Sequence, residues 1–151
     1  MVAIQLSVMK GERDMEKIIY NKMIPAKGYK AITILPFIFV RAEKKGKLLP
    51  CDYRHERIHL KQQMETFILA QVVCVCMLLA GFGWWSLAIL PLYFYIYLLE
   101  WAVKLAITRN SHIAYRSIST EQEAYAFEHT EDYLSRRENF AWVKYIFKIK
   151  R

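Results

Sequence analysis

One long uncharged stretch limits what this chain can fold into. Residues 66–99 contain no Asp, Glu, Lys or Arg, although the whole sequence carries 22 Lys and Arg against 14 Asp and Glu. As one straight helix, this stretch would be about 50 Å long, whereas the hydrocarbon core of a bilayer is about 30 Å thick. Gly81 and Gly83 interrupt it near the middle, and Trp84 and Trp85 follow, a pair typical of a membrane–water interface. The stretch therefore predicts a helical hairpin in a membrane.

The two arms of this hairpin can be placed from their flanks. We expect the first arm to be the end of a helix over residues 52–80, and the second arm to cover 86–107, with a kink at Pro91. A buried hairpin in a soluble protein is the alternative, but 151 residues leave too little other chain to cover two helices that are apolar on nearly every face. Each uncharged arm is short for a full span, so the hairpin is transmembrane or re-entrant.

The basic residues predict the orientation of the hairpin. Thirteen Lys and Arg lie at or before Lys61, nine lie at or after Lys104, and none lies between them. Under the positive-inside rule, both termini are then cytoplasmic, and the tip of the hairpin faces outward from the inner membrane. Three cysteines are too few and odd in number for a disulfide scaffold, which agrees with a reducing compartment.

The rest of the chain predicts a single domain over 1–151 that is mainly α-helical with a small β-hairpin. Residues 1–14 are expected to be loosely ordered. Within the β-hairpin region, 23–50, residues 29–41 are rich in β-branched and aromatic side chains, 43–47 form a turn, and 48–50 form a short return strand. Asp52 is the expected N-cap of the helix that follows.

Two further helices are expected after the hairpin. The first covers 119–137 and is capped by Ser119 or Thr120, with acidic residues in its first turns. The second covers 139–151, where aromatic residues alternate with basic ones, and it resembles an interfacial helix that meets anionic headgroups. Nucleic acid is the weaker interpretation of this basic tail, because the adjoining membrane explains the aromatics better. A helix packed on its own domain is the simpler alternative.

One motif carries chemistry. His55, Glu56 and His59 form the pattern HExxH. On a helix, the two histidines lie one turn apart on one face, so both imidazoles can reach one Zn²⁺ ion. Glu56 lies beside them, where it can take a proton from a metal-bound water. The motif therefore predicts a zinc site with Glu56 as its general base.

The best candidate for the third ligand of a catalytic zinc follows the hairpin in the sequence. Glu121 begins the segment Glu-Gln-Glu-Ala-Tyr and is 62 positions after His59, but a hairpin that leaves and returns on one side brings the two together. HExxH followed by a helical Glu-x-x-Ala-Asp resembles the gluzincin metallopeptidases, whose membrane branches include the CAAX prenyl protease and heat-shock membrane protease group and the β-lactam sensor proteases. The resemblance implies that Glu121 is a zinc ligand.

That resemblance covers about a quarter of the chain and has one departure. The Asp of the family motif, which orients a zinc-bound histidine, is replaced here by Tyr125, so we expect Tyr125 in the second shell of the metal without the charge of a carboxylate. The whole chain also looks like a group of short HExxH membrane proteins from Bacteroidota.

Several other residues are candidates for the site. Glu123 lies on the other side of its helix and is the fallback for Glu121, and His129 is a further ligand candidate. One of three residues just before the Glu121 helix could donate to an oxyanion or contact substrate, and each could equally lie at the membrane interface: His112, Tyr115 and Arg116.

These features predict a Zn²⁺ metallopeptidase at the cytoplasmic face of the membrane. Its partners would be a peptide or membrane-protein substrate and membrane lipids, with no nucleic acid, and it could belong to an oligomer or a larger membrane complex. One alternative is a structural or regulatory membrane subunit with a decayed or structural zinc site. Another is a zinc hydrolase of a lipid or other non-peptide substrate.

Overall fold

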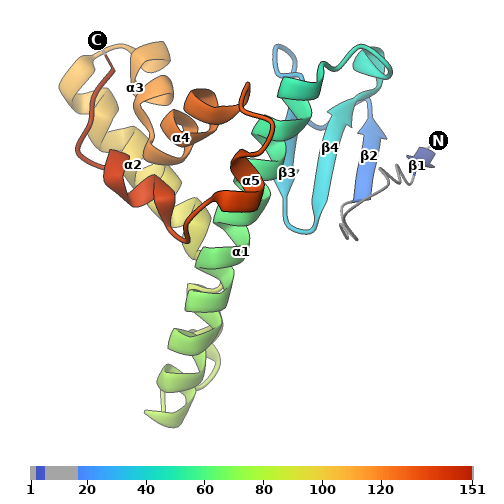
Figure 1. Cartoon of the computed structure of the whole chain (residues 1–151). Helices are drawn as coiled ribbons and strands as arrows, with labels where there is room; N and C mark the ends of the chain where they lie inside the picture. The colour runs from blue at the N-terminus through green and yellow to red at the C-terminus, as the bar shows by residue number, and fades with distance from the viewer. Residues whose placement is uncertain (1–2, 6–16, 151) are drawn as a thin grey trace.

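The longest helix, α1 (Pro50–Leu79), runs through the middle of the molecule and continues beyond it as one arm of a protruding hairpin (Figure 1). The computed structural model describes residues 3–5 and 17–150. In these residues the chain is mainly helical, with one small sheet on one side of α1 and the remaining helices on the other (Figure 1). The predicted helix over 52–80 is confirmed to within two residues.

Helix α1 begins differently from the prediction. Pro50 is its first residue and Leu49 is the N-cap. Asp52 lies at the third helical position, where its carboxylate accepts a hydrogen bond of 2.9 Å from the backbone N–H of Leu49. Pro50 suits the first position because it has no N–H to leave unpaired there. Asp52 is therefore not the N-cap residue that we expected, but its carboxylate still caps the helix, by reaching back from the first turn to Leu49.

The sheet is mixed and has the strand order β1-β2-β4-β3. A β-hairpin is present, formed by β3 (Ala31–Ile34) and β4 (Phe37–Arg41), but it is not the expected one: both strands lie within the predicted first strand, 29–41, the turn is at Leu35 and Pro36, and residues 48–50 are not a return strand. Strand β2 (Lys17–Asn21), which the sequence reading missed, pairs in parallel with β4.

The core of the sheet is small and apolar. Ile18, Ile38 and Val40 form a buried cluster on the sheet, and the burial of Ile18 in this cluster stabilises the pairing of β2 with β4. Of the residues expected to be loosely ordered, 1–14, the structure describes only β1 (Ala3–Gln5), which pairs antiparallel with β2. The rest of that prediction lies outside the described residues.

The predicted hairpin is present. After α1 the chain turns at Gly81 and Gly83, whose φ values of 88° and 56° favour glycine. It returns through the 3₁₀ helix η2 (Gly83–Ile89) and α2 (Leu92–Thr108), which meet at a bend of 57° near Pro91. Helix α1 alone is long and apolar enough to cross a membrane, and η2 with α2 would be a second, broken span.

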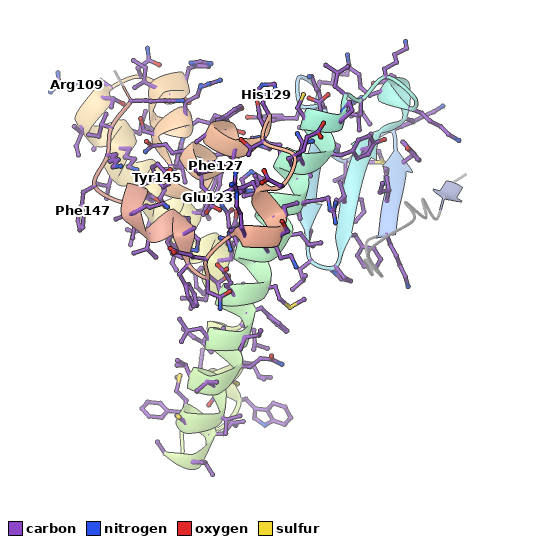
Figure 2. All side chains as sticks on the ribbon, in the orientation of Figure 1. Arg109, Glu123, Phe127, His129, Tyr145 and Phe147 are labelled. Atoms are coloured by element: carbon purple, nitrogen blue, oxygen red, sulfur yellow. The ribbon has the colours of Figure 1, made fainter. Side chains whose placement is uncertain are left out.

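The surface of the hairpin is apolar. Trp84 is 87% exposed at its tip, and further large apolar side chains are exposed along both arms. Figure 2 shows side chains pointing outward along the whole protruding part. An exposed apolar surface of this extent marks a membrane or a protein contact. The exposed residues include Phe67, Ile68, Leu69, Val72, Val75, Leu78, Leu79, Phe82, Trp85, Leu98, Leu99, Val103 and Ile107.

The segment after the hairpin is more broken than predicted. In place of one helix over 119–137, the structure has α4 (Ser119–Phe127), a turn, and α5 (Tyr133–Arg136). A short helix, α3 (Ser111–Ser117), precedes α4 and was not expected. The side chain of Asn110 caps α3 by accepting a hydrogen bond of 3.1 Å from the N–H of Ile113.

The basic aromatic tail packs on the body of the protein instead of forming one helix over 139–151. Only the 3₁₀ helix η3 (Ala141–Tyr145) is helical there, and Trp142 is buried. The Gln122 side-chain amide donates to the backbone carbonyls of Ser117 and Lys148, at 2.6 and 2.9 Å. These bonds fix the tail against α4, although Phe147 points away from the body (Figure 2).

Candidate metal centre

Two imidazoles and one carboxylate converge between α1 and α4. His55 and His59 lie one turn apart on α1, and their Nε2 atoms are 3.2 Å apart. Glu121, on α4, places one carboxylate oxygen 3.5 Å from Nε2 of His55 and the other 3.5 Å from Nε2 of His59. In a tetrahedral zinc site, ligand atoms at about 2.0–2.1 Å from the metal lie about 3.3 Å from one another. The three side chains thus have the spacing of ligands to one metal ion.

Hydrogen bonds to the outer nitrogens orient both imidazoles. Nδ1 of His55 lies 2.9 Å from a carboxylate oxygen of Glu128, which can only accept, so Nδ1 donates. Nδ1 of His59 lies 2.8 Å from Oε1 of Gln62, whose amide nitrogen donates to the backbone carbonyl of Thr120. When both imidazoles are neutral, their Nε2 atoms therefore carry lone pairs that face one another, an arrangement that a metal ion, or a proton on one of them, stabilises.

The electrostatics of Glu121 also favour a positive charge between the three side chains. One of its oxygens accepts a hydrogen bond of 3.0 Å from the hydroxyl of Tyr97, and the other, Oε2, is buried without a hydrogen bond among the described residues. Burial alone would raise its pKa, but His59 and His55 outweigh burial and hold the pKa of Glu121 well below its usual range. Burial likewise opposes a charge on His59, yet Glu121 raises the pKa of His59 to about 9. The site attracts a positive charge.

A residue of the hairpin holds the start of α4. The carboxylate of Glu100, on α2, accepts hydrogen bonds from the backbone N–H and the hydroxyl of Ser119, at 3.0 and 2.6 Å. Lys104, one turn later on α2, binds Glu100 and the backbone carbonyl of Ser117. Ser119 was expected to cap α4 with its own side chain, but the cap comes from α2. This contact sets the position of Glu121 two residues further along.

Glu123 is not one of the three converging side chains, as predicted, but it is fully buried. Its carboxylate binds Arg137, which also binds Glu65 of α1. It accepts two more hydrogen bonds, from the hydroxyl of Tyr133 at 2.8 Å and from the amide of Gln62 at 3.1 Å. Glu123 therefore supports the side chain that orients the second imidazole.

Glu56 is held by the edge strand of the sheet. The hydroxyl of Thr33, on β3, donates to Oε2 of Glu56 at 2.8 Å and to its backbone carbonyl at 3.1 Å. Burial raises the pKa of Glu56, against the opposing effects of His59 and of the Thr33 hydrogen bond. A carboxylate with a raised pKa, held beside the ligands, is a suitable proton acceptor.

Two cavities meet at these ligands. One, of about 550 Å³, is mainly apolar and lies against α2, with Tyr93, Phe94, Tyr97, Leu98 and Trp101 in its wall. The other, of about 450 Å³, is more polar, and its wall includes Lys30, Asp52, His112, Arg116, Tyr125 and Glu128. Five residues line both cavities: Tyr29, Ala31, His55, Glu56 and Tyr115. The ligand site thus lies between an apolar and a polar space.

The other residues predicted for the site differ in how close they lie to the three ligands. Tyr115 lines both cavities, whereas His112 and Arg116 line only the polar one. Tyr125 packs the edge of its ring against His55, with centroids 4.7 Å apart. His129 is 76% exposed and contacts Glu128 at 3.3 Å, so it is not one of the converging ligands.

Sequence reasoning missed several residues of this site: Thr33, Gln62, Tyr97 and Glu128. Of these, Glu128 bonds to Nδ1 of His55, an orienting contact that was expected of Tyr125. Its spacing of seven from Glu121, two helical turns, was the available signal.

Comparisons of the chain with family models, with curated proteins and with solved structures find no match.

Proposed function

We propose that this protein is a zinc-dependent metallopeptidase at the cytoplasmic face of a membrane. The observation that carries the proposal is the convergence of His55, His59 and Glu121, with both imidazoles turned so that their lone pairs face one point. Two imidazoles and a carboxylate are the protein ligands of several catalytic zinc sites in peptidases. Other divalent transition metals can use the same ligands.

The roles of the neighbouring side chains follow from their positions. Bound zinc polarises a carbonyl group and makes a nucleophilic water available near neutral pH. Glu56 would accept a proton from the attacking water and return it to the leaving nitrogen, while Thr33 holds one carboxylate oxygen of Glu56 in place. Tyr115 lines both cavities, so its hydroxyl can donate to the oxygen of a scissile bond that lies between them.

The free edge of β3 favours a peptide over a lipid substrate. The backbone carbonyl of Lys30, just before β3, accepts from the N–H of Arg41, the last residue of β4, so the backbone groups of the next residue, Ala31, point to the open side. Further along this edge, the side chain of Gln63 binds the carbonyl of Thr33 at 2.7 Å. An extended peptide can therefore pair with Ala31 beside the ligands, and Gln63 limits where that pairing ends.

The hairpin supports a location at the membrane. Its uncharged surface suits lipid, and the basic residues on both flanks favour termini on the cytoplasmic side. The larger cavity is lined by α2, so apolar parts of a substrate can reach the ligands from the bilayer side. We therefore expect membrane-associated polypeptides as substrates.

The test is metal content together with peptide cleavage. Purified wild-type protein should hold close to one zinc ion per chain and cleave some members of a peptide library. Glu56→Gln should keep the zinc and lose cleavage, whereas Glu138→Gln, the same change at an exposed position, should alter neither. A wild type that keeps zinc but cleaves nothing would favour the structural-subunit alternative, and one without metal would overturn the site.

A further inference from the structure

Arg116 is an arginine without an acidic partner in the wall of a cavity. It lies on α3 and lines the polar cavity next to His55 and Glu56. Among the described residues, its guanidinium makes no ion pair or hydrogen bond. Each of the three carboxylates in the same wall has another partner. Asp52 forms an ion pair with Lys30 at 2.7 Å. Glu56 accepts a hydrogen bond from the hydroxyl of Thr33, and Glu128 lies 2.9 Å from Nδ1 of His55.

Tyr125 holds this guanidinium in place. The central carbon of the Arg116 guanidinium lies 4.0 Å from the centre of the Tyr125 ring, which is the distance of a stacked cation–π contact. The same ring meets His55 at its edge. Tyr125 thus links the free cation to a candidate metal ligand.

A second cation lies near the ring of Tyr125. Nζ of Lys150, in the tail, lies 5.8 Å from the centre of the Tyr125 ring and has no ion pair among the described residues. The backbone N–H of Lys150 donates to the hydroxyl of Ser117 at 2.9 Å, which fixes the tail beside α3. Two cations without an ion pair among the described residues therefore lie around the ring of Tyr125, and of these Arg116 lines the polar cavity.

We propose that Arg116 forms a binding subsite for a carboxylate of the substrate, in the polar cavity beside the candidate metal centre. A planar guanidinium with free N–H groups matches a carboxylate through two parallel hydrogen bonds. The carboxylate is an acidic side chain or the C-terminus of the substrate chain. The proposal rests on the proposed peptidase function for the nature of its ligand, a polypeptide, and adds that the residues on the two sides of the scissile bond differ in polarity.

The test measures peptide binding, so it does not require turnover. Three fluorescent hexapeptides of one apolar sequence are compared: one with Asp and an amidated C-terminus, one with Asn and a free C-terminus, and one with Asn and an amidated C-terminus. Dissociation constants are measured by fluorescence anisotropy on zinc-loaded Glu56→Gln protein in detergent micelles. At least one carboxylate peptide should bind about tenfold or more tightly than the neutral one, and which one it is identifies the source of the carboxylate.

Variants assign this preference to its residue. In Arg116→Gln, the ratio between the peptides should fall close to one, whereas Arg136→Gln, an exposed arginine on α5, should keep the wild-type ratio. Arg116→Lys keeps the charge without the planar fork and should retain only part of the preference. Circular dichroism and zinc content verify that each variant is folded.

The outcomes separate the two proposals. Equal binding of the three peptides, no binding of any, or a preference that survives in Arg116→Gln would overturn the subsite. If wild type then cleaves all three peptides equally, the peptidase function stands without the subsite. A carboxylate preference that depends on Arg116, in a protein that cleaves no peptide, would support the subsite and refute the peptidase function.

Discussion

Replacing Glu128 should weaken zinc binding while leaving the fold intact. Glu128 accepts the hydrogen bond from Nδ1 of His55, and its negative charge makes that imidazole a better ligand. The side chain of Arg54 binds the backbone carbonyl of residue 128, not its carboxylate. A change in the side chain therefore leaves the attachment between α1 and the end of α4 in place.

Two substitutions of Glu128 should lower zinc affinity by different amounts. Glu128→Gln keeps an oxygen that can accept from His55 and removes only the charge, so we expect zinc affinity to fall about tenfold, or about 1.4 kcal/mol. Glu128→Ala removes the acceptor as well, and affinity should fall by closer to 100-fold. Because 21% of the Glu128 side chain is exposed, water can partly replace it, which keeps the loss within that range.

Competition with a chromophoric zinc chelator, in detergent micelles at pH 7.5, measures these affinities. Glu131→Gln is the matched control, since it makes the same change three residues later on an exposed side chain. His55→Ala sets the upper limit, because it removes the ligand itself. If Glu128→Ala binds zinc as tightly as wild type while His55→Ala does not, the assignment of Glu128 to the orientation of His55 is wrong.

Three further predictions address the site, the fold and the membrane. Glu121→Gln should release zinc from folded protein, whereas Glu123→Gln should lower the melting temperature and retain zinc in the folded fraction; the reverse would exchange the two roles. Arg137→Ala should cost about 3–5 kcal/mol in denaturant unfolding, because it leaves the fully buried carboxylate of Glu123 and the largely buried one of Glu65 without their cation, and a loss below 1 kcal/mol would contradict this. In a cysteine-free background, Trp84→Cys should react with an impermeant thiol reagent outside intact cells and Lys45→Cys should not; reversed labelling would refute the orientation, and protection of both would indicate a re-entrant hairpin.

The parts of the structure that follow from the sequence are those with a short-range signal. The hairpin follows from a run of residues without charge and from the glycines that turn it. The positions of His55 and His59 follow from helical periodicity, because residues four apart share a face. Glu121 was reached in two ways, through the return of the hairpin and through a family motif, and the structure places it beside both histidines.

The parts that could not be predicted depend on contacts between distant segments. The parallel pairing of β2 with β4 depends on the small core of Ile18, Ile38 and Val40. The sequence of residues 17–21 does not predict β4 as their partner. The cap of α4 comes from Glu100, 19 positions before Ser119. The predicted single helix over 119–137 ends early, at Phe127, where the turn brings Glu128 to His55. Local propensity cannot report such partners, because they exist only in the folded chain.

The hairpin also supports the candidate metal site. Tyr97, on its second arm, donates a hydrogen bond to Glu121, and Glu100 on the same arm fixes the start of the helix that carries this ligand. The first arm continues without a break from the turns that carry the two histidines. Because both arms hold ligands or their supports, the packing of α1 against α2 sets the distance between the imidazoles and the carboxylate. A membrane that keeps the two arms together would thereby also keep the metal site assembled.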